Sequence, residues 1–260
     1  MNIATSPASI AGVSEAEWQI RCDLAALYRL VAHHRWTDFI YTHLSARVPG
    51  PEHHFLINKY GVNFQHMRAS DLVKIDVEGN IVEQHRNLSS RDVNAAGFTI
   101  HSAIHMARPD LMCVVHTHTP AGIAVSAQKD GLLPLSQHAC KFYNRLAYHG
   151  YEGIALDLDE RERLVADLGP EHKAMILRNH GLLVGGTSIP EAFLNIYMLE
   201  RACAAQVDAL SGGRDIILPP PEVCQHTSDQ FKRHEHDEHY GMVWNAALAL
   251  IEDGKPDYRS

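Results

Sequence analysis

Three histidines stand where apolar, strand-like segments end, and their type and spacing suit a metal ion. His116 and His118 close one such segment, and His180 follows the apolar run 174–177. Side chains at positions i and i+2 of a strand point to the same face, roughly 7 Å apart. A small bend at the strand end can then bring both imidazoles within about 2.0–2.1 Å of one ion. Gly181 lets the backbone turn close to that ion. Three neutral imidazoles with an open coordination position are typical of a catalytic metal.

A metal-free alternative exists for the same residues. A His-x-His pair at a strand end can simply pack or form hydrogen bonds, and the spacing alone leaves both alternatives open. The metal could be Zn²⁺, which we expect first, or Mn²⁺, Co²⁺ or Fe²⁺, because imidazole accepts all of them and availability often decides.

The elements that must position these histidines alternate between strand-like and helical patterns. A capping box at Ser14 starts an amphipathic helix, and Pro109 ends another. Strands are predicted at 39–48, 54–58, 70–76, 111–116, 132–135, 174–177 and 182–184, and helices at 91–108, 119–125, 160–168, 188–210 and 228–251. The early strands form antiparallel hairpins, and helices flank the strands. We therefore expect an α/β fold, a three-layer α/β/α sandwich around a mainly antiparallel sheet. It would form a single domain over 1–260, with a core at about 17–210 and a helical extension at about 211–260.

Composition excludes several classes of function. The net charge is −8 and no Lys/Arg run occurs, which argues against a nucleic-acid partner. No stretch approaches the ~20 apolar residues that span a bilayer, and the N-terminus has no secretory signal pattern. The five cysteines are scattered, which favours a reducing compartment. We expect a cytoplasmic protein without a membrane partner.

Both histidine segments resemble the metal-site motifs of the class II aldolase/adducin family. The first is Val114 to Pro120, and the second is Leu177 to Gly181. The preceding helix at 100–110 and the following one at 190–200 are also similar, and the resemblance extends from about Glu17 to Leu210. It implies a class II aldolase-like fold, metal binding by the three histidines, and a homotetramer with sites at subunit interfaces. It also implies Lewis-acid stabilisation of an enediolate, with a glutamate transferring protons.

This sequence departs from the family at that glutamate. The aldolase pattern is Ser-Ser-Glu, an aromatic residue, two further residues and His, whereas this chain reads Ala-Ala-Gly-Phe-Thr-Ile-His at 95–101. Gly97 therefore replaces the carboxylate. The Gly-Asn-x-Ser phosphate loop appears as Thr-His-Leu-Ser at 42–45, and Thr-Pro-Ser-Gly appears as Asn-Lys-Tyr-Gly at 58–61. Because the donors that cradle a phosphate are lost, the substrate is not expected to be a standard sugar phosphate. The segment Asn-Ala-Ala-Gly-Phe at 94–98 resembles the adducin-like branch of the family more closely than the aldolases.

Other residues are candidates for substrate binding or catalysis. Asn58 and Lys59 would face the pocket, where the ammonium could hold a carboxylate, unless Lys59 is a solvated loop residue. His101 lies one helical turn beyond the missing carboxylate and either transfers protons or is a core histidine. His138 could line the cleft. Tyr143 either donates to a carbonyl oxygen or packs at a surface.

A histidine-rich segment lies on the last predicted helix. His234, His236, His239 and Tyr240 could form a second metal site or reach a neighbouring subunit's pocket, or they could be a solvated face.

Together, these patterns predict a metal-dependent, aldolase-like lyase that cleaves a C–C bond next to a carbonyl. Its substrate would be a small carbonyl or carboxylate compound. Decarboxylation fits better than retro-aldol cleavage, because loss of carbon dioxide needs no base to start. The resemblance also implies decarboxylation, since some family members are decarboxylases. The alternative is a non-catalytic, adducin-like binding or scaffold protein.

Overall fold

The computed structural model describes residues 12–83, 88–154, 158–252 and 257–260. Within them, seven strands form one sheet in the order β3-β2-β1-β4-β7-β6-β5. The strands are β1 Leu44–Arg47, β2 Phe55–Ile57, β3 Val73–Ile75, β4 Cys113–Thr117, β5 Ala147–His149, β6 Ala174–Leu177 and β7 Gly181–Gly186. Neighbouring strands are antiparallel except β5 and β6, which are parallel. The predicted, mainly antiparallel sheet is confirmed.

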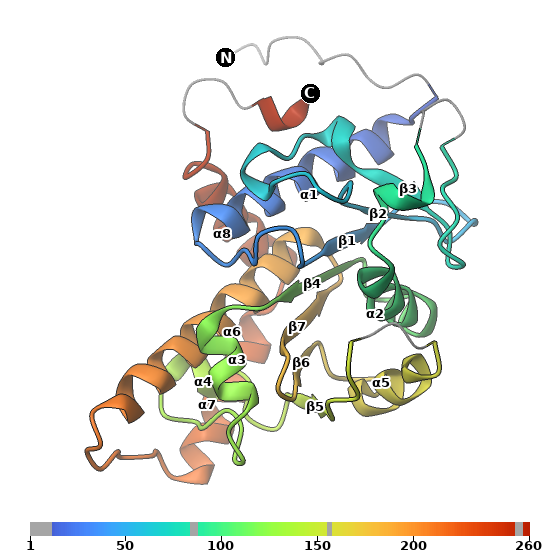
Figure 1. Ribbon diagram of the computed structural model, residues 1–260. Coiled ribbons are helices and arrows are strands. Elements are labelled where there is room, and N and C mark those ends of the chain that lie inside the picture. The colour runs from blue at the N-terminus through green and yellow to red at the C-terminus, as the bar shows by residue number, and fades with distance from the viewer. Residues whose placement is uncertain (1–11, 84–87, 155–157, 253–256) are drawn as a thin grey trace.

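Helices cover both faces of this sheet (Figure 1). One layer contains α1 Glu15–His33, α6 Ile189–Ser211 and α8 Asp237–Leu248, and the opposite layer contains α2 Ala95–Ala107 and α5 Glu160–Leu168. The short helices α3 Pro120–Ser126 and α4 Gln137–Cys140 pack on α6, and α7 Pro221–His234 packs on α4. The α/β/α sandwich is therefore also confirmed. Among the described residues, no helix has the length and apolarity needed to cross a membrane.

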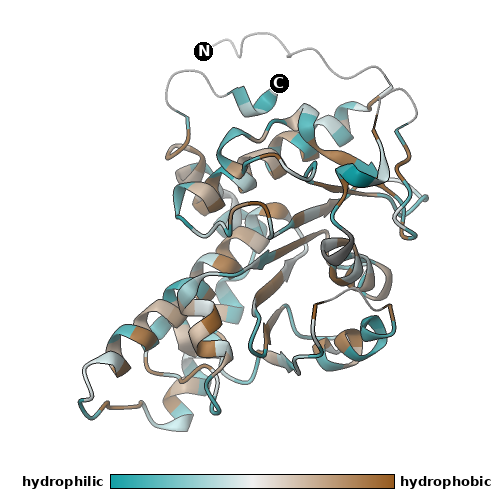
Figure 2. Cartoon of the chain, viewed as in Figure 1, coloured by the Kyte–Doolittle hydropathy of each residue, from teal (hydrophilic) through white to brown (hydrophobic). Residues whose placement is uncertain are grey.

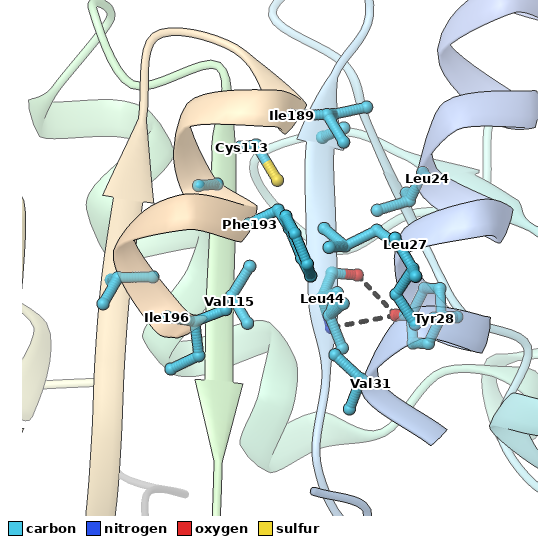
Figure 3. Packing of buried hydrophobic residues seen from close by; sticks show 14 of the residues in the cluster. Leu24, Leu27, Tyr28, Val31, Leu44, Cys113, Val115, Ile189, Phe193 and Ile196 are labelled. Carbon is cyan, nitrogen blue, oxygen red and sulfur yellow. Dashed lines mark hydrogen bonds between the residues drawn. The ribbon is translucent and has the colours of Figure 1, made fainter. Parts of the chain in front are cut away.

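Hydrophobic residues concentrate on the strands and on the adjoining helix surfaces (Figure 2). Figure 3 shows the larger core cluster, in which α1 and α6 pack against the strands. Cys113 and Val115 of β4 point into this cluster, whereas Val114 points to the opposite cluster under α2 and α5. Because strand side chains alternate, His116 belongs on the side of Val114 and Thr117 on the side of α6.

Local signals in the sequence explain where several helices begin. Ser14 caps α1 by accepting a hydrogen bond from the Glu17 N–H at 3.2 Å. Thr119 caps α3 in the same way through the Gly122 N–H at 3.0 Å, with Pro120 in the first turn. Helix α3 therefore starts directly after the His116–His118 segment.

Two of the predicted elements are wrong. Residues 132–135 contain no strand, because Pro134 interrupts them and their backbone bonds to side chains: the Leu132 N–H donates to the Tyr148 hydroxyl and the Leu133 N–H to Gln206 Oε1. The helix predicted at 228–251 is two helices, α7 and α8, separated at Glu235 and His236. Strand β5 was not predicted.

Candidate metal centre

The ends of β4 and β7 meet at the three predicted histidines. His116 lies on β4, paired with Leu183 of β7, and His180 occupies the turn that enters β7. A Cβ atom on Gly181 would lie only 2.3 Å from the Thr117 carbonyl oxygen. Glycine at this position is what lets the β6–β7 turn approach the end of β4 so closely.

The three imidazoles converge through the same ring nitrogen. His118 Nε2 lies 2.8 Å from His116 Nε2 and 2.9 Å from His180 Nε2. Nitrogen ligands at about 2.0–2.1 Å from a tetrahedral ion lie ~3.3 Å apart, so the rings need to separate by only about 0.5 Å to hold one. In the part of the chain that the structure describes, this is the one group of three or more candidate ligands that is close enough to share an ion.

Partners outside the triad set the direction of two rings. The His116 Nδ1–H donates to the Leu182 carbonyl oxygen at 2.8 Å, and His118 Nδ1 lies 3.0 Å from a carboxylate oxygen of Asp38. With Nδ1 as the donor, the lone pair of each Nε2 faces the shared point. Metal-binding histidines are oriented in this way by carbonyl or carboxylate partners, so the donor set fits a divalent ion.

Electrostatics also keeps these rings in the form that binds metal. Burial, reinforced by the neighbouring histidines, holds the pKa of His116 well below its usual range. Burial and the proximity of His118 lower the pKa of His180 to about 4. Both imidazoles are therefore neutral near pH 7, and only a neutral imidazole offers a lone pair to a cation.

A buried carboxylate supports the histidine segment from behind. Glu200 of α6 accepts hydrogen bonds from the Thr117 and Thr119 hydroxyls at 2.5 and 2.6 Å. These threonines alternate with the two histidines, so the carboxylate fixes one face while the imidazoles occupy the other. Burial raises the pKa of Glu200 to about 7. The prediction from sequence missed this role, although the alternation of Thr and His pointed to two distinct faces.

The space beside Gly97, where the family resemblance predicts a carboxylate, is filled by His43. An ideal Cβ on Gly97 would lie 2.4–2.7 Å from three atoms of the His43 ring. His43 is buried, and its backbone carbonyl accepts a hydrogen bond from the His116 N–H at 3.1 Å. Burial, with a contribution from His118, lowers the pKa of His43 to about 4. In the sequence, His43 stands out only as part of the altered phosphate loop at 42–45.

Two of the predicted residues lie close to this histidine. His101 is fully buried on α2, with its ring 6.1 Å from that of His43. Its Nδ1 forms a hydrogen bond of 2.6 Å with Ser45 Oγ, which also contacts His105 Nε2 at 2.8 Å. Asn58 is buried as well, and its side chain lies close enough to His43 to oppose the lowering of the pKa of that imidazole.

The remaining predicted residues make other contacts. Lys59, with 39% of its side chain exposed, pairs with Asp92 at 3.3 Å. His138 is partly exposed on α4. Tyr143 follows α4, and its carbonyl oxygen accepts a hydrogen bond from Ser228 of α7.

The histidine-rich segment does not form one helical face. His234 is the last residue of α7, His236 caps α8, and His239 lies in its first turn, with the rings of His236 and His239 6.2 Å apart. Tyr240 turns inward, and its hydroxyl donates to Glu191 at 3.0 Å. Within the described ranges, these histidines do not form a cluster of three candidate ligands.

Comparison with known proteins identifies close relatives. The family model described as Class II Aldolase and Adducin N-terminal domain matches residues 22–207. An aldolase II superfamily protein from Pseudomonas syringae has a crystal structure that matches with a TM-score of 0.90 at 54% identity, over 96% of this chain and 98% of that one. L-fuculose 1-phosphate aldolase from Glaciozyma antarctica PI12 matches with a TM-score of 0.80 at 31% identity, over 95% and 93%. Alpha-adducin from Rattus norvegicus is 47% identical over 210 residues, which are 79% of this chain and 28% of that protein.

Proposed function

The chain belongs to the class II aldolase/adducin family, and from that premise we propose that it is a metal-dependent lyase that cleaves a C–C bond next to a carbonyl. The observation that carries this proposal is the convergence of three imidazole Nε2 atoms on one point. His116, His118 and His180 would hold the ion, with Zn²⁺ expected first and Mn²⁺, Co²⁺ or Fe²⁺ as alternatives. When bound, the ion would supply Lewis-acid stabilisation of an enolate.

The residues around this centre favour decarboxylation over retro-aldol cleavage. Helix α2 presents Gly97 where the family has its proton-carrying glutamate, so no carboxylate at this position can remove a proton to start cleavage. A carboxylic acid whose departing carbon dioxide leaves its electron pair on the carbon next to a carbonyl needs no such base, because that pair forms the enolate directly. The similarity to an L-fuculose 1-phosphate aldolase supports the retro-aldol branch, so both remain in the experiment below.

Substrate contacts are proposed for the residues that follow β2. Asn58 lies beside His43, and Lys59 would offer its ammonium to a substrate carboxylate in exchange for Asp92. His138 is proposed as a further cleft residue, and Tyr143 as a donor to a carbonyl oxygen. For His101, the buried bond to Ser45 supports a role behind the site rather than in contact with the substrate.

We also propose a homotetramer with the centre near a subunit interface. Large side chains next to site residues are exposed: Phe39 follows Asp38, Tyr41 precedes the Thr42–Ser45 segment, and the ring of Tyr151 lies 6.5 Å from that of His180. Exposed apolar groups that gather in one region mark contact surfaces. Sedimentation velocity tests the assembly, and a monomer at micromolar concentration contradicts it.

The second candidate function is an adducin-like binding or scaffold protein. The identity to alpha-adducin, 47% over 210 residues, favours it. The complete triad, with its orienting partners, favours the enzyme.

Metal analysis separates the two functions. The purified protein is expected to retain about one divalent ion per chain, and His116→Ala to lose it, while the exposed control His66→Ala keeps it. Equal, negligible metal in all three proteins contradicts the enzyme. The loaded protein is then screened with 2-keto acids, hydroxy-aromatic acids and sugar phosphates for release of carbon dioxide or aldehyde. Aldehyde released only from a phosphorylated sugar would show that the argument against a phosphate substrate is wrong.

A further inference from the structure

The packing of His43 against Gly97 makes the two residues mutually dependent. The His43 Cδ2, Cγ and Nε2 atoms lie 2.4, 2.5 and 2.7 Å from the place that a Cβ on Gly97 would take. Real Cβ contacts essentially never fall below 3.0 Å. Any residue larger than glycine at this point of α2 must displace the imidazole, so the ring occupies the volume into which a longer side chain from α2 would extend.

The imidazole is held at this point from two directions. The His43 carbonyl oxygen accepts a hydrogen bond from the His116 N–H, so the backbone of His43 is joined to β4, the strand that carries His116. On the other side, Ser45 bridges His101 and His105 of α2. These bonds fix α2 against β1. His43 lies between the two elements and is 3% exposed.

One edge of the ring has no partner. The Cγ–Cδ2–Nε2 edge faces Gly97, so Nδ1 lies on the opposite edge. Among the described residues, His43 Nδ1 is a buried atom without a hydrogen-bond partner, and so are the neighbouring Thr42 Oγ1 and His101 Nε2. Buried polar atoms of this kind normally bind water, an ion or a ligand. Thr42 and His43 lie directly before β1 and His101 lies on α2, so the unpartnered Nδ1 of His43, next to the strand that carries His116, marks a place for a polar group.

We propose that His43 is a substrate-binding residue of the metal centre, whose Nδ1 hydrogen-bonds an oxygen atom of the carbonyl or carboxylate ligand from the position that a carboxylate on α2 would otherwise hold. This role rests on the proposed function. In this role His43, just before β1, supplies the polar group that α2 lacks at Gly97. Its imidazole can donate or accept a hydrogen bond, according to its tautomer.

The first test is independent of any metal. Gly97→Ala is expected to lower the thermal unfolding midpoint, because its Cβ collides with the ring of His43. In the His43→Ala background the same substitution should raise the midpoint, because alanine is favoured over glycine within a helix. Gly241→Ala on α8 is the matched control, since its Cβ meets no atom within 4 Å and its effect should be the same in both backgrounds. An equal effect of Gly97→Ala in both backgrounds contradicts the packing.

The second test measures the ligand contact directly. The protein is loaded with Co²⁺ and titrated with acetohydroxamate, a bidentate oxygen ligand, while the visible absorption of the ion is followed. His43→Leu should bind Co²⁺ with unchanged stoichiometry but acetohydroxamate about tenfold more weakly, as expected for the loss of one hydrogen bond. His43→Asn places an amide near the Nδ1 position and should recover most of the affinity.

The outcomes separate this role from the function on which it rests. Normal Co²⁺ binding with equal acetohydroxamate affinity in the wild type and His43→Leu overturns the His43 role alone. Co²⁺ binding that is absent, or unaffected by His116→Ala, overturns the metal-dependent lyase and the His43 role together.

Discussion

Glu200 offers the sharpest test of how the histidine segment is supported, because a buried carboxylate there has a measurable dependence on pH. The perturbation is Glu200→Gln, which keeps the size and shape of the side chain and one acceptor oxygen for the hydroxyls of Thr117 and Thr119. It removes the ability to ionise and replaces the second acceptor oxygen by an N–H donor, to which one of the two hydroxyl oxygens can accept instead. The residue is 3% exposed, and neither of its hydrogen-bond partners is charged.

The magnitude follows from the pKa of this carboxyl, which burial raises from 4.5 to about 7. A group whose folded-state pKa is raised contributes stability that is fully present below the unfolded-state pKa and is lost as pH rises through the folded-state pKa. For Glu200 the window runs from about pH 4.5 to about pH 7.5. Between pH 5 and pH 8, the wild type should lose about 2–3 kcal/mol of unfolding free energy relative to Glu200→Gln.

The assay is urea unfolding of metal-free protein, with chelator present, at four pH values from 5 to 8. Histidines that titrate in this range act on the wild type and the variant alike, so their contribution cancels in the difference. Glu222→Gln, at an exposed glutamate at the start of α7, is the matched control for exchanging a carboxyl for an amide. A wild-type-minus-Glu200→Gln difference that stays constant within about 0.5 kcal/mol refutes the reasoning.

Three further predictions concern the surroundings of the triad. Asp38→Asn should weaken metal binding about 10–100-fold, because the variant no longer presents a carboxylate to His118 Nδ1. Competition with a chromophoric chelator measures the metal affinity, and an unchanged affinity would mean that the contact is incidental. Tyr28→Phe should destabilise the protein by about 1–3 kcal/mol in urea unfolding, because the Tyr28 hydroxyl accepts hydrogen bonds from the buried N–H groups of Leu44 and Asn58 at 2.9 and 3.1 Å. A loss of unfolding free energy below about 0.5 kcal/mol would contradict this role of the hydroxyl. Gly181→Ala should lower the unfolding free energy by about 1–3 kcal/mol and reduce the metal content, because its Cβ would lie 2.3 Å from the Thr117 carbonyl oxygen. Wild-type stability and metal content in this variant would show that the β6–β7 turn can shift to make room.

The elements predicted correctly are those whose signals are local. The helix at 160–168 and the strand at 174–177 have the predicted bounds, and Thr119 with Pro120 marked the start of α3. The failures arise where distant residues decide the backbone. Glu235 ends α7 in an ion pair with Lys141 and Arg145, both at 2.5 Å. No periodicity in the sequence reports such a contact.

The same distinction separates the predicted from the unpredicted parts of the site. The three histidines follow from two short motifs, each of which contains its own turn signal. Asp38 carries no such signal, since it lies in the loop after α1 and reaches His118 only through the fold. Glu200 lies inside a region of family resemblance, yet its role depends on the spacing of threonines on another element. Residues that act only through long-range contacts are therefore the ones that the sequence did not reveal.

The exchange at Gly97 illustrates why a lost catalytic group does not by itself indicate a lost site. Position 97 on α2 and position 43 before β1 share one volume, so a large side chain at either position excludes a large side chain at the other. A chain with a carboxylate at 97 cannot hold His43 in its present place, and a chain with His43 in this place must have glycine at 97. The two positions must therefore change together. Because the paired change leaves a buried, polar imidazole next to an intact triad, it favours altered chemistry at the metal over the decay of the site into a scaffold.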